Sequence, residues 1–187
     1  WMRLLKTVDN SVLWLKSPNP SALVNLRREA NARGVASERL VFAPRAPQAK
    51  DHLARLQLAD LFLDTLPYNA HASACDALWV GVPAVTCLGN TFPGRVAAGL
   101  LHAVGLPELV TASLAEYENL ATALALDPDR LASIKAKLMR KRYTEPLFDT
   151  ARFTRDLESA YMIMWKRQQD DLPAASFAVD RTPVCAA

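Results

Sequence analysis

Short apolar segments alternate with longer segments of helical periodicity through the first 112 residues of the chain. Apolar runs bounded by turn-forming residues predict five buried β-strands, at 11–16, 39–43, 59–64, 83–88 and 109–110. Apolar residues spaced three and four apart predict helices between them, at 22–33, 48–56, 73–80 and 94–104. Ser21 is expected to cap the one at 22–33. Strict alternation of helices with strands that are apolar on both faces indicates right-handed βαβ units, and therefore an α/β domain with one parallel sheet.

Helical patterns dominate after residue 112. Helices are predicted at 114–126, 129–142 and 149–168, with Ser113 and Asp127 as N-caps. The last one carries a stripe typical of packing against this domain or a neighbouring one, made of Phe153, Leu157, Tyr161, Met164 and Trp165. We therefore divide the chain into an α/β core (1–112), C-terminal helices that pack on it (113–169) and a weakly ordered tail (170–187).

Composition and charge argue against several classes of protein. The net charge is only +3, and the chain lacks the concentrated basic stripe of nucleic-acid-binding proteins. One dense basic run, 135–142, has helical spacing and is explained best as a solvated helix face. No apolar run is long enough to cross a membrane. The three cysteines, Cys75, Cys87 and Cys185, are too scattered for a disulfide framework or a zinc site, so a cytoplasmic location is expected.

The segment 64–76 has the strongest chemical signal. A strand ends at Asp64, and a loop of small and polar residues then leads into a helix. Ligands of open parallel sheets bind beyond the carboxyl ends of the strands, and the free N–H groups at a helix start attract anions. His71 and Ser73 add hydrogen-bond donors for a phosphate, and Asp76, one turn into the helix, is suited to accept from ribose hydroxyls. The alternative is an ordinary capped helix with an incidental histidine.

Two other strand ends are weaker candidates. His52 and Arg55 lie three residues apart on one helix face, where planar side chains can stack on a base while the backbone near Ala46 reads its edge. The alternative, a solvated amphipathic helix, explains this segment better when it is taken alone. The loop 89–95 contains two glycines, Thr91 and Arg95, and fits a ligand contact and a plain turn equally well. No carboxylate pair, nucleophile–base set or metal-ligand cluster is present, so the catalytic base stays unknown and no metal is expected.

At these positions the chain resembles the protein O-GlcNAc transferases. The similarity extends from about residue 1 to 165 and rests on five segments, 9–15, 57–60, 63–65, 76–83 and 95–97. It implies a bacterial homologue with the two-domain GT-B fold, of which this chain is the Rossmann-like C-terminal domain with a helical extension. It also implies inverting, metal-independent transfer of N-acetylglucosamine from UDP-GlcNAc to Ser or Thr hydroxyls of proteins. The other catalytic half and a tetratricopeptide superhelix then lie outside this chain and are its partners.

The resemblance also implies roles for single residues. A UDP-sugar site is expected to comprise Ala46, Lys50, His52, Arg55, His71, Ala72, Ser73 and Asp76. Asp76 matches the ribose-binding acid, while His52 and Arg55 match positions at the uridine. Where the family has Gly-His-Thr-Thr-Gly, this chain has Ala-His-Ala-Ser-Ala at 70–74, so one of two hydroxyls is lost. The family lysine near the base aligns with Gln48 or Lys50, and we choose Lys50.

Two other functions remain open from the sequence. A related transferase with another donor or acceptor, such as an asparagine glucosyltransferase, would share most of these residues. A nucleotide-binding domain without catalytic activity would explain the alanines at positions 72 and 74.

Overall fold

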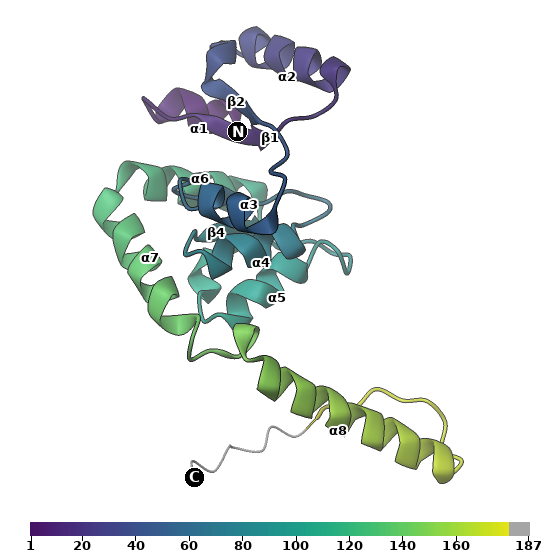
Figure 1. The fold of residues 1–187 in the computed structure, drawn as a ribbon. Helices are drawn as coiled ribbons and strands as arrows, with labels where there is room; N and C mark the ends of the chain where they lie inside the picture. The colour runs from purple at the N-terminus through teal and green to yellow at the C-terminus, as the bar shows by residue number, and fades with distance from the viewer. Residues whose placement is uncertain (180–187) are drawn as a thin grey trace.

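The computed structural model describes residues 1–179, which form eight α-helices and five short strands; Pro183 and Cys185 lie outside this range. Figure 1 shows the chain path. The helices are α1 (Met2–Thr7), α2 (Pro20–Ala32), α3 (Ala49–Leu56), α4 (Ala72–Trp79), α5 (Val96–Ala103), α6 (Leu114–Leu126), α7 (Pro128–Lys141) and α8 (Thr150–Gln169). The strands are β1 (Leu13–Lys16), β2 (Leu40–Ala43), β3 (Phe62–Leu63), β4 (Ala84–Cys87) and β5 (Val110–Thr111).

All strand pairs are parallel, which confirms the predicted α/β class. The strands form two sheets, however, where the sequence predicted one. β1 pairs with β2 so that Trp14 lies opposite Val41, and a second sheet has the order β3-β4-β5. Within residues 1–179 no ladder joins β1 to β3. On its other edge β3 pairs with β4, where the N–H groups of Phe62 and Asp64 donate to the carbonyls of Pro83 and Val85.

Two clusters of buried side chains hold these sheets. The larger surrounds β4 and includes Leu78 of α4, Leu101 of α5, and Leu124 and Leu138 of α6 and α7, all at most 1% exposed. The smaller lies between α1, α2 and the β1-β2 sheet. Leu63 of β3 packs against both clusters, so the end of this strand lies where the two parts of the core meet.

Local capping explains several helix boundaries. Ser113 and Asp127 cap α6 and α7 as predicted, accepting from the N–H groups of Glu116 and Arg130. The prediction that Ser21 caps the second helix was wrong. Asn19 caps α2 instead and accepts from Ala22 N at 2.8 Å, because Pro20 fits the first helical position, where no N–H partner is needed.

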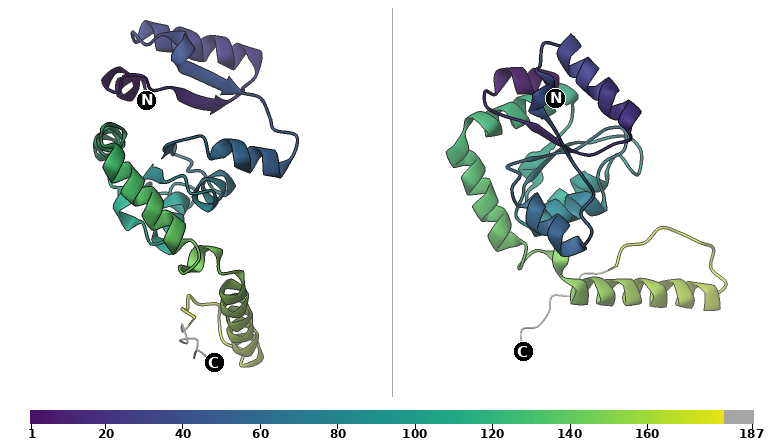
Figure 2. Two further views of the ribbon diagram at one scale, coloured as in Figure 1. Left: turned by 60° about the vertical axis from the view of Figure 1, so that its left-hand side comes forward. Right: turned by 45° about the horizontal axis from the view of Figure 1, so that its top comes forward.

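The C-terminal helices differ in how they pack. α6 and α7 bury apolar residues against β4, and three lysines of the basic run on α7 form ion pairs, Lys135 with Asp60, Lys137 with Glu108 and Lys141 with Glu145. By contrast, α8 extends away from the remainder of the molecule (Figures 1 and 2) and has no buried residue. Its predicted packing stripe is therefore exposed in this chain, at Phe153, Leu157, Tyr161, Met164 and Trp165.

Residues 172–179 follow α8 without regular secondary structure. Among the described residues, no helix combines the length and apolar character that crossing a membrane requires.

Candidate functional site

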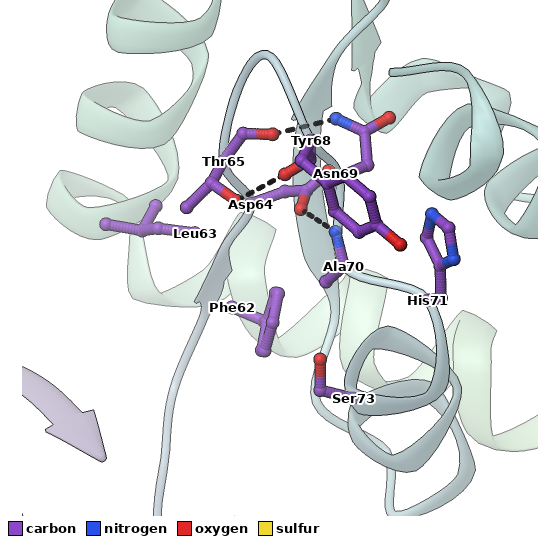
Figure 3. A pocket seen from close by; sticks show the side chains of 9 residues that line it. All are labelled: Phe62, Leu63, Asp64, Thr65, Tyr68, Asn69, Ala70, His71 and Ser73. Carbon is purple, nitrogen blue, oxygen red and sulfur yellow. Dashed lines mark hydrogen bonds between the residues drawn. The ribbon is translucent and has the colours of Figure 1, made fainter. Parts of the chain in front are cut away.

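A cleft of about 380 Å³ lies at the carboxyl end of β3 (Figure 3). It coincides with the loop that the sequence singled out. Its lining consists of Phe62, Leu63, Asp64, Thr65, Tyr68, Asn69, Ala70, His71 and Ser73. The strand supplies the first residues of this lining and the start of α4 supplies the last, so the cleft lies where ligands of parallel α/β sheets bind.

The Asp64 carboxylate fixes the path of the loop between β3 and α4. This carboxylate is 5% exposed, and its two oxygens accept from Ala70 N at 2.6 Å and from the Thr86 hydroxyl at 2.5 Å. The Tyr117 hydroxyl donates to the Asp64 carbonyl at 3.0 Å. Three separate elements thus hold Asp64, and through Ala70 it sets where the loop turns towards α4. Asp64 is therefore a positioning residue of the cleft, because both of its carboxylate oxygens already accept hydrogen bonds within the protein.

Asn69 fixes the other side of the loop. It is 1% exposed, and its side-chain amide donates to the Thr65 carbonyl at 2.8 Å, while its backbone N–H donates to the Pro93 carbonyl at 3.1 Å. Its side-chain oxygen is buried and has no hydrogen-bond partner among the described residues. The Thr65 hydroxyl closes the turn by donating to the Tyr68 carbonyl at 2.7 Å.

The loop after β4 supports this arrangement. Gly94 packs so closely that a Cβ atom there would lie 3.0 Å from the Pro67 carbonyl. Gly94 N donates to the Thr91 hydroxyl at 3.3 Å, and the Arg95 guanidinium donates to the Asn90 carbonyl at 2.8 Å. The sequence left open whether this segment contacts a ligand or forms a plain turn. The structure provides contacts that stabilise the turn.

The start of α4 offers hydrogen-bond donors. The N–H groups of Ala74 and Cys75 donate to the His71 carbonyl, whereas within residues 1–179 those of Ala72 and Ser73 have no acceptor. His71 occupies the N-cap position, but its side chain does not cap the helix. Two free N–H groups at the positive end of a helix, with the Ser73 hydroxyl beside them, suit an anionic oxygen.

The His71 ring completes this donor set. It stacks on the Tyr68 ring, with centroids 4.9 Å apart and planes inclined by 20° (Figure 3). Its Nε2 atom is buried and has no partner among the described residues. A buried polar atom without a partner is costly, and here it lies on a residue that lines the cleft. Tyr68 therefore holds the His71 ring at the edge of the cleft, with one ring nitrogen that no described residue satisfies.

His52 and Asp76 meet although 24 positions separate them in the sequence. His52 Nε2 on α3 lies 3.6 Å from an Asp76 carboxylate oxygen on α4, and their side chains are 40% and 43% exposed. Asp76 also lies one helical turn beyond Ser73. The structure thus brings a candidate base-contacting residue, a candidate ribose acid and a candidate phosphate site onto two adjacent helices.

The remaining predicted site residues, Arg55, Ala46 and Lys50, differ in their contacts within the protein. The Arg55 guanidinium donates to the Pro44 carbonyl at 2.6 Å and lies over the Trp14 ring of β1. Ala46 is half-buried in the loop between β2 and α3, and Lys50 is exposed in the first turn of α3. Within the described part of the chain, the Lys50 ammonium takes part in no hydrogen bond or ion pair, and the Ala46 backbone takes part in no hydrogen bond.

Sequence reasoning missed the supporting residues Asn69, Thr86 and Tyr117. Asn69 had a local signal, because an asparagine next to a proline-containing turn commonly bonds its own loop. Thr86 and Tyr117 had none, since their contacts to Asp64 span 22 and 53 positions. Among residues 1–179, no three His, Cys, Asp or Glu side chains are grouped so as to hold a metal ion.

Similarity to known proteins identifies the family of this chain. The family model described as glycosyl transferase family 41 matches residues 1–157. This chain belongs to that family. The match includes both sheets, all residues that line the cleft, and α3 and α4.

Named relatives cover most of this family 41 chain. A UDP-N-acetylglucosamine–peptide N-acetylglucosaminyltransferase of Caenorhabditis elegans is 36% identical over 173 residues, covering 92% of this chain and 15% of that protein. A probable enzyme of the same name, SEC, of Arabidopsis thaliana is 39% identical over 166 residues, covering 88% of this chain and 17% of that protein. The chain thus spans about a sixth of the length of these two relatives.

A solved structure supports the fold assignment. The K341M mutant of the Thermobaculum terrenum O-GlcNAc transferase is similar to this chain with a TM-score of 0.85 and 35% identity. The similarity covers 91% of this chain and 33% of that one. The chain therefore has the fold of part of a bacterial O-GlcNAc transferase, as the sequence resemblance implied.

Proposed function

We propose that this chain is the donor-binding part of a protein O-GlcNAc transferase. The enzyme transfers N-acetylglucosamine from UDP-GlcNAc to Ser or Thr hydroxyls of proteins, with inversion at the anomeric carbon and without a metal ion. Membership of family 41 and the names of its relatives support the reaction type. The single observation that carries the proposal is the donor set at the start of α4, which lies next to the His52–Asp76 pair.

The diphosphate, ribose and uracil of the nucleotide sugar each have a matching group in this scheme. The diphosphate accepts from the N–H groups of Ala72 and Ser73, the Ser73 hydroxyl and His71 Nε2. Asp76 accepts from the ribose hydroxyls. The uracil lies against His52 and Arg55 on α3, with the Ala46 backbone at its edge and Lys50 nearby.

The chemistry needs stabilisation of the leaving group. Negative charge builds on UDP as its bond to the sugar breaks, and without a metal this charge must be met by fixed N–H dipoles and the histidine. The N–H groups at the start of α4 are held by Asp64 through Ala70, so they need little reorganisation during the reaction. No described residue is placed to deprotonate an acceptor hydroxyl, so we place the catalytic base in the other half of the enzyme.

The partners follow from the same scheme. They are UDP-GlcNAc, protein acceptors, the N-terminal catalytic half and a tetratricopeptide superhelix of the same protein, in the cytoplasm. Nucleic acid has no role in it, because the ion pairs of Lys135, Lys137 and Lys141 neutralise much of the one basic run.

Calorimetric titration of the full-length protein with UDP and UDP-GlcNAc tests this proposal. We expect both to bind. His71→Ala should weaken the binding of UDP by about 1–3 kcal/mol, the scale of one hydrogen bond to a charged group. His102→Ala at the end of α5 is the matched control and should leave binding unchanged. Absence of heat with any uridine nucleotide would overturn the proposal. Binding without transfer to a protein acceptor would indicate a nucleotide-binding domain that has lost activity.

A further inference from the structure

Arg55 connects three parts of the molecule that surround the proposed uridine site. It projects from α3, the helix that also carries His52, and its guanidinium donates to the Pro44 carbonyl at 2.6 Å. Pro44 directly follows β2 and begins the loop that contains Ala46. The guanidinium carbon also lies 5.8 Å from the centroid of the Trp14 ring on β1. One side chain thus joins a helix, a loop and a strand.

The hydrogen bond gives Arg55 a role within the protein itself. A guanidinium has five N–H donors in a rigid plane, and at least one of them is committed to the loop carbonyl. This bond restrains the backbone two residues before Ala46. Any change in the position of the guanidinium therefore changes the position of the loop that faces the base in the proposed function.

The Trp14 ring is what holds the guanidinium in place. A cation within about 6 Å of an indole face is attracted by the ring quadrupole, and the attraction grows as water is excluded. Trp14 is half-buried, and β1 is fixed by its pairing with β2, so the ring gives the guanidinium a rigid support. The guanidinium is held between this ring and the Pro44 carbonyl.

We infer that Trp14 is a positioning residue for nucleotide recognition. Its ring keeps Arg55 on the Pro44 carbonyl, and the resulting fixed loop 44–48 discriminates uracil from other bases. The role rests on the proposed function, because it presumes that the base lies against α3 and this loop. It is separate from the diphosphate contacts, which lie at the start of α4.

The same small sheet provides a matched control. Arg27 of α2 lies over the Phe42 ring of β2, with 5.6 Å from the guanidinium carbon to the ring centroid. Phe42 is paired with Leu15 and Trp14 with Val41, so the two aromatic rings stand on opposite faces of the sheet. Within the described residues the Arg27 guanidinium bonds no loop carbonyl. Replacing Phe42 removes a similar contact without reaching loop 44–48.

The experiment compares UDP with cytidine diphosphate in the full-length protein by calorimetry. Trp14→Leu should raise the dissociation constant for UDP about two- to tenfold, the range of one cation–π contact. Binding of cytidine diphosphate should change less, so the preference for UDP should fall. Trp14→Phe should retain much of the preference for UDP, because it keeps an aromatic ring, and Phe42→Leu should leave that preference unchanged. In an Arg55→Ala background, Trp14→Leu should have no further effect, because the two residues act as one unit.

The outcomes separate the two proposals. Equal weakening of both nucleotides, or a Trp14→Leu protein that binds UDP as the wild type does, would overturn the positioning role and leave the proposed function intact. A wild-type protein without affinity for UDP would overturn both. Since Trp14→Leu can impair folding, Arg55→Ala provides a second test of the same contact. An unaltered preference for UDP in a folded Arg55→Ala protein would overturn the role as well.

Discussion

Asp64 illustrates how a buried carboxylate can position the loop of a candidate site. Each of its carboxylate oxygens accepts one hydrogen bond, and its carbonyl accepts a third from Tyr117. A buried carboxylate is costly unless such partners satisfy it. In return, this network fixes the loop whose N–H groups face the cleft. Stability and binding are therefore coupled at this residue.

Asp76 is the residue whose replacement tests the ribose contact most directly. Asp76→Ala should weaken UDP binding by about 1–3 kcal/mol, because a charge-assisted hydrogen bond to the ribose is lost. Calorimetry against the wild type measures this change. Asp129→Ala, an exposed carboxylate in the first turn of α7, is the control and should bind UDP normally. An unchanged affinity in Asp76→Ala would remove Asp76 from the proposed site.

Tyr117 predicts how stability depends on alkaline pH. Burial raises the pKa of its hydroxyl well above 10.0, the ordinary value. Below pH 10 the tyrosine is protonated in both states, so its contribution to stability is complete. Above pH 10 only the unfolded chain releases this proton, so the free energy of unfolding should fall by about 1.4 kcal/mol for each further pH unit.

Urea unfolding of the wild type and Tyr117→Phe between pH 9 and pH 12 measures this effect. The variant should be less stable at pH 9, by about 0.5–1.5 kcal/mol for the lost hydrogen bond, and its stability should fall less steeply with pH. Tyr161→Phe on exposed α8 should follow the wild type. Parallel pH curves for the wild type and Tyr117→Phe would contradict the assignment.

At the scale of elements, the sequence predicted correctly those features that depend on contacts between residues close together in the chain. The five strands and the N-caps Ser113 and Asp127 were predicted from residues that lie within a few positions of each other. Asn19 was missed in favour of Ser21, because either residue can cap a helix and the choice depends on where Pro20 fits. The division into two sheets was not predictable, since alternation of elements does not reveal which strands form hydrogen bonds.

The cap of α7 gives a prediction at this scale. Asp127 accepts from Arg130 N at 2.9 Å, and α7 buries Leu131, Ile134 and Leu138. Asp127→Ala should therefore lower the free energy of unfolding by about 1 kcal/mol, whereas Asp127→Ser should retain most of it. Urea unfolding of both variants measures the difference. Equal stability of the alanine and serine variants would show that the cap contributes little.

At the scale of the whole molecule, the site depends on contacts between distant segments. His71, Ser73 and Asp76 were predictable together because one loop and one helix carry them. Their approach to His52 was expected only through the family resemblance, because no local pattern fixes how α3 lies against α4. The exposed stripe on α8 likewise shows that periodicity identifies an apolar face without identifying what covers it.

The proposed metal independence concerns the whole enzyme and has its own test. Transfer of N-acetylglucosamine by the full-length protein should be unchanged after dialysis against EDTA, because N–H groups and His71 meet the charge on departing UDP in the proposed scheme. Activity measured before and after dialysis, with UDP affinity as the control for intact folding, decides this point. A loss of transfer that Mg²⁺ or Mn²⁺ restores would require a metal site.

The free N–H groups of Ala72 and Ser73 have a consequence for how such sites evolve. A donor supplied by the main chain is encoded by the course of the backbone, so it survives any substitution other than proline that preserves the helix start. Descendants can then exchange threonine for alanine at position 72 and still present the same donors. A search keyed to the side chains of the family loop would therefore overlook homologues that keep its chemistry.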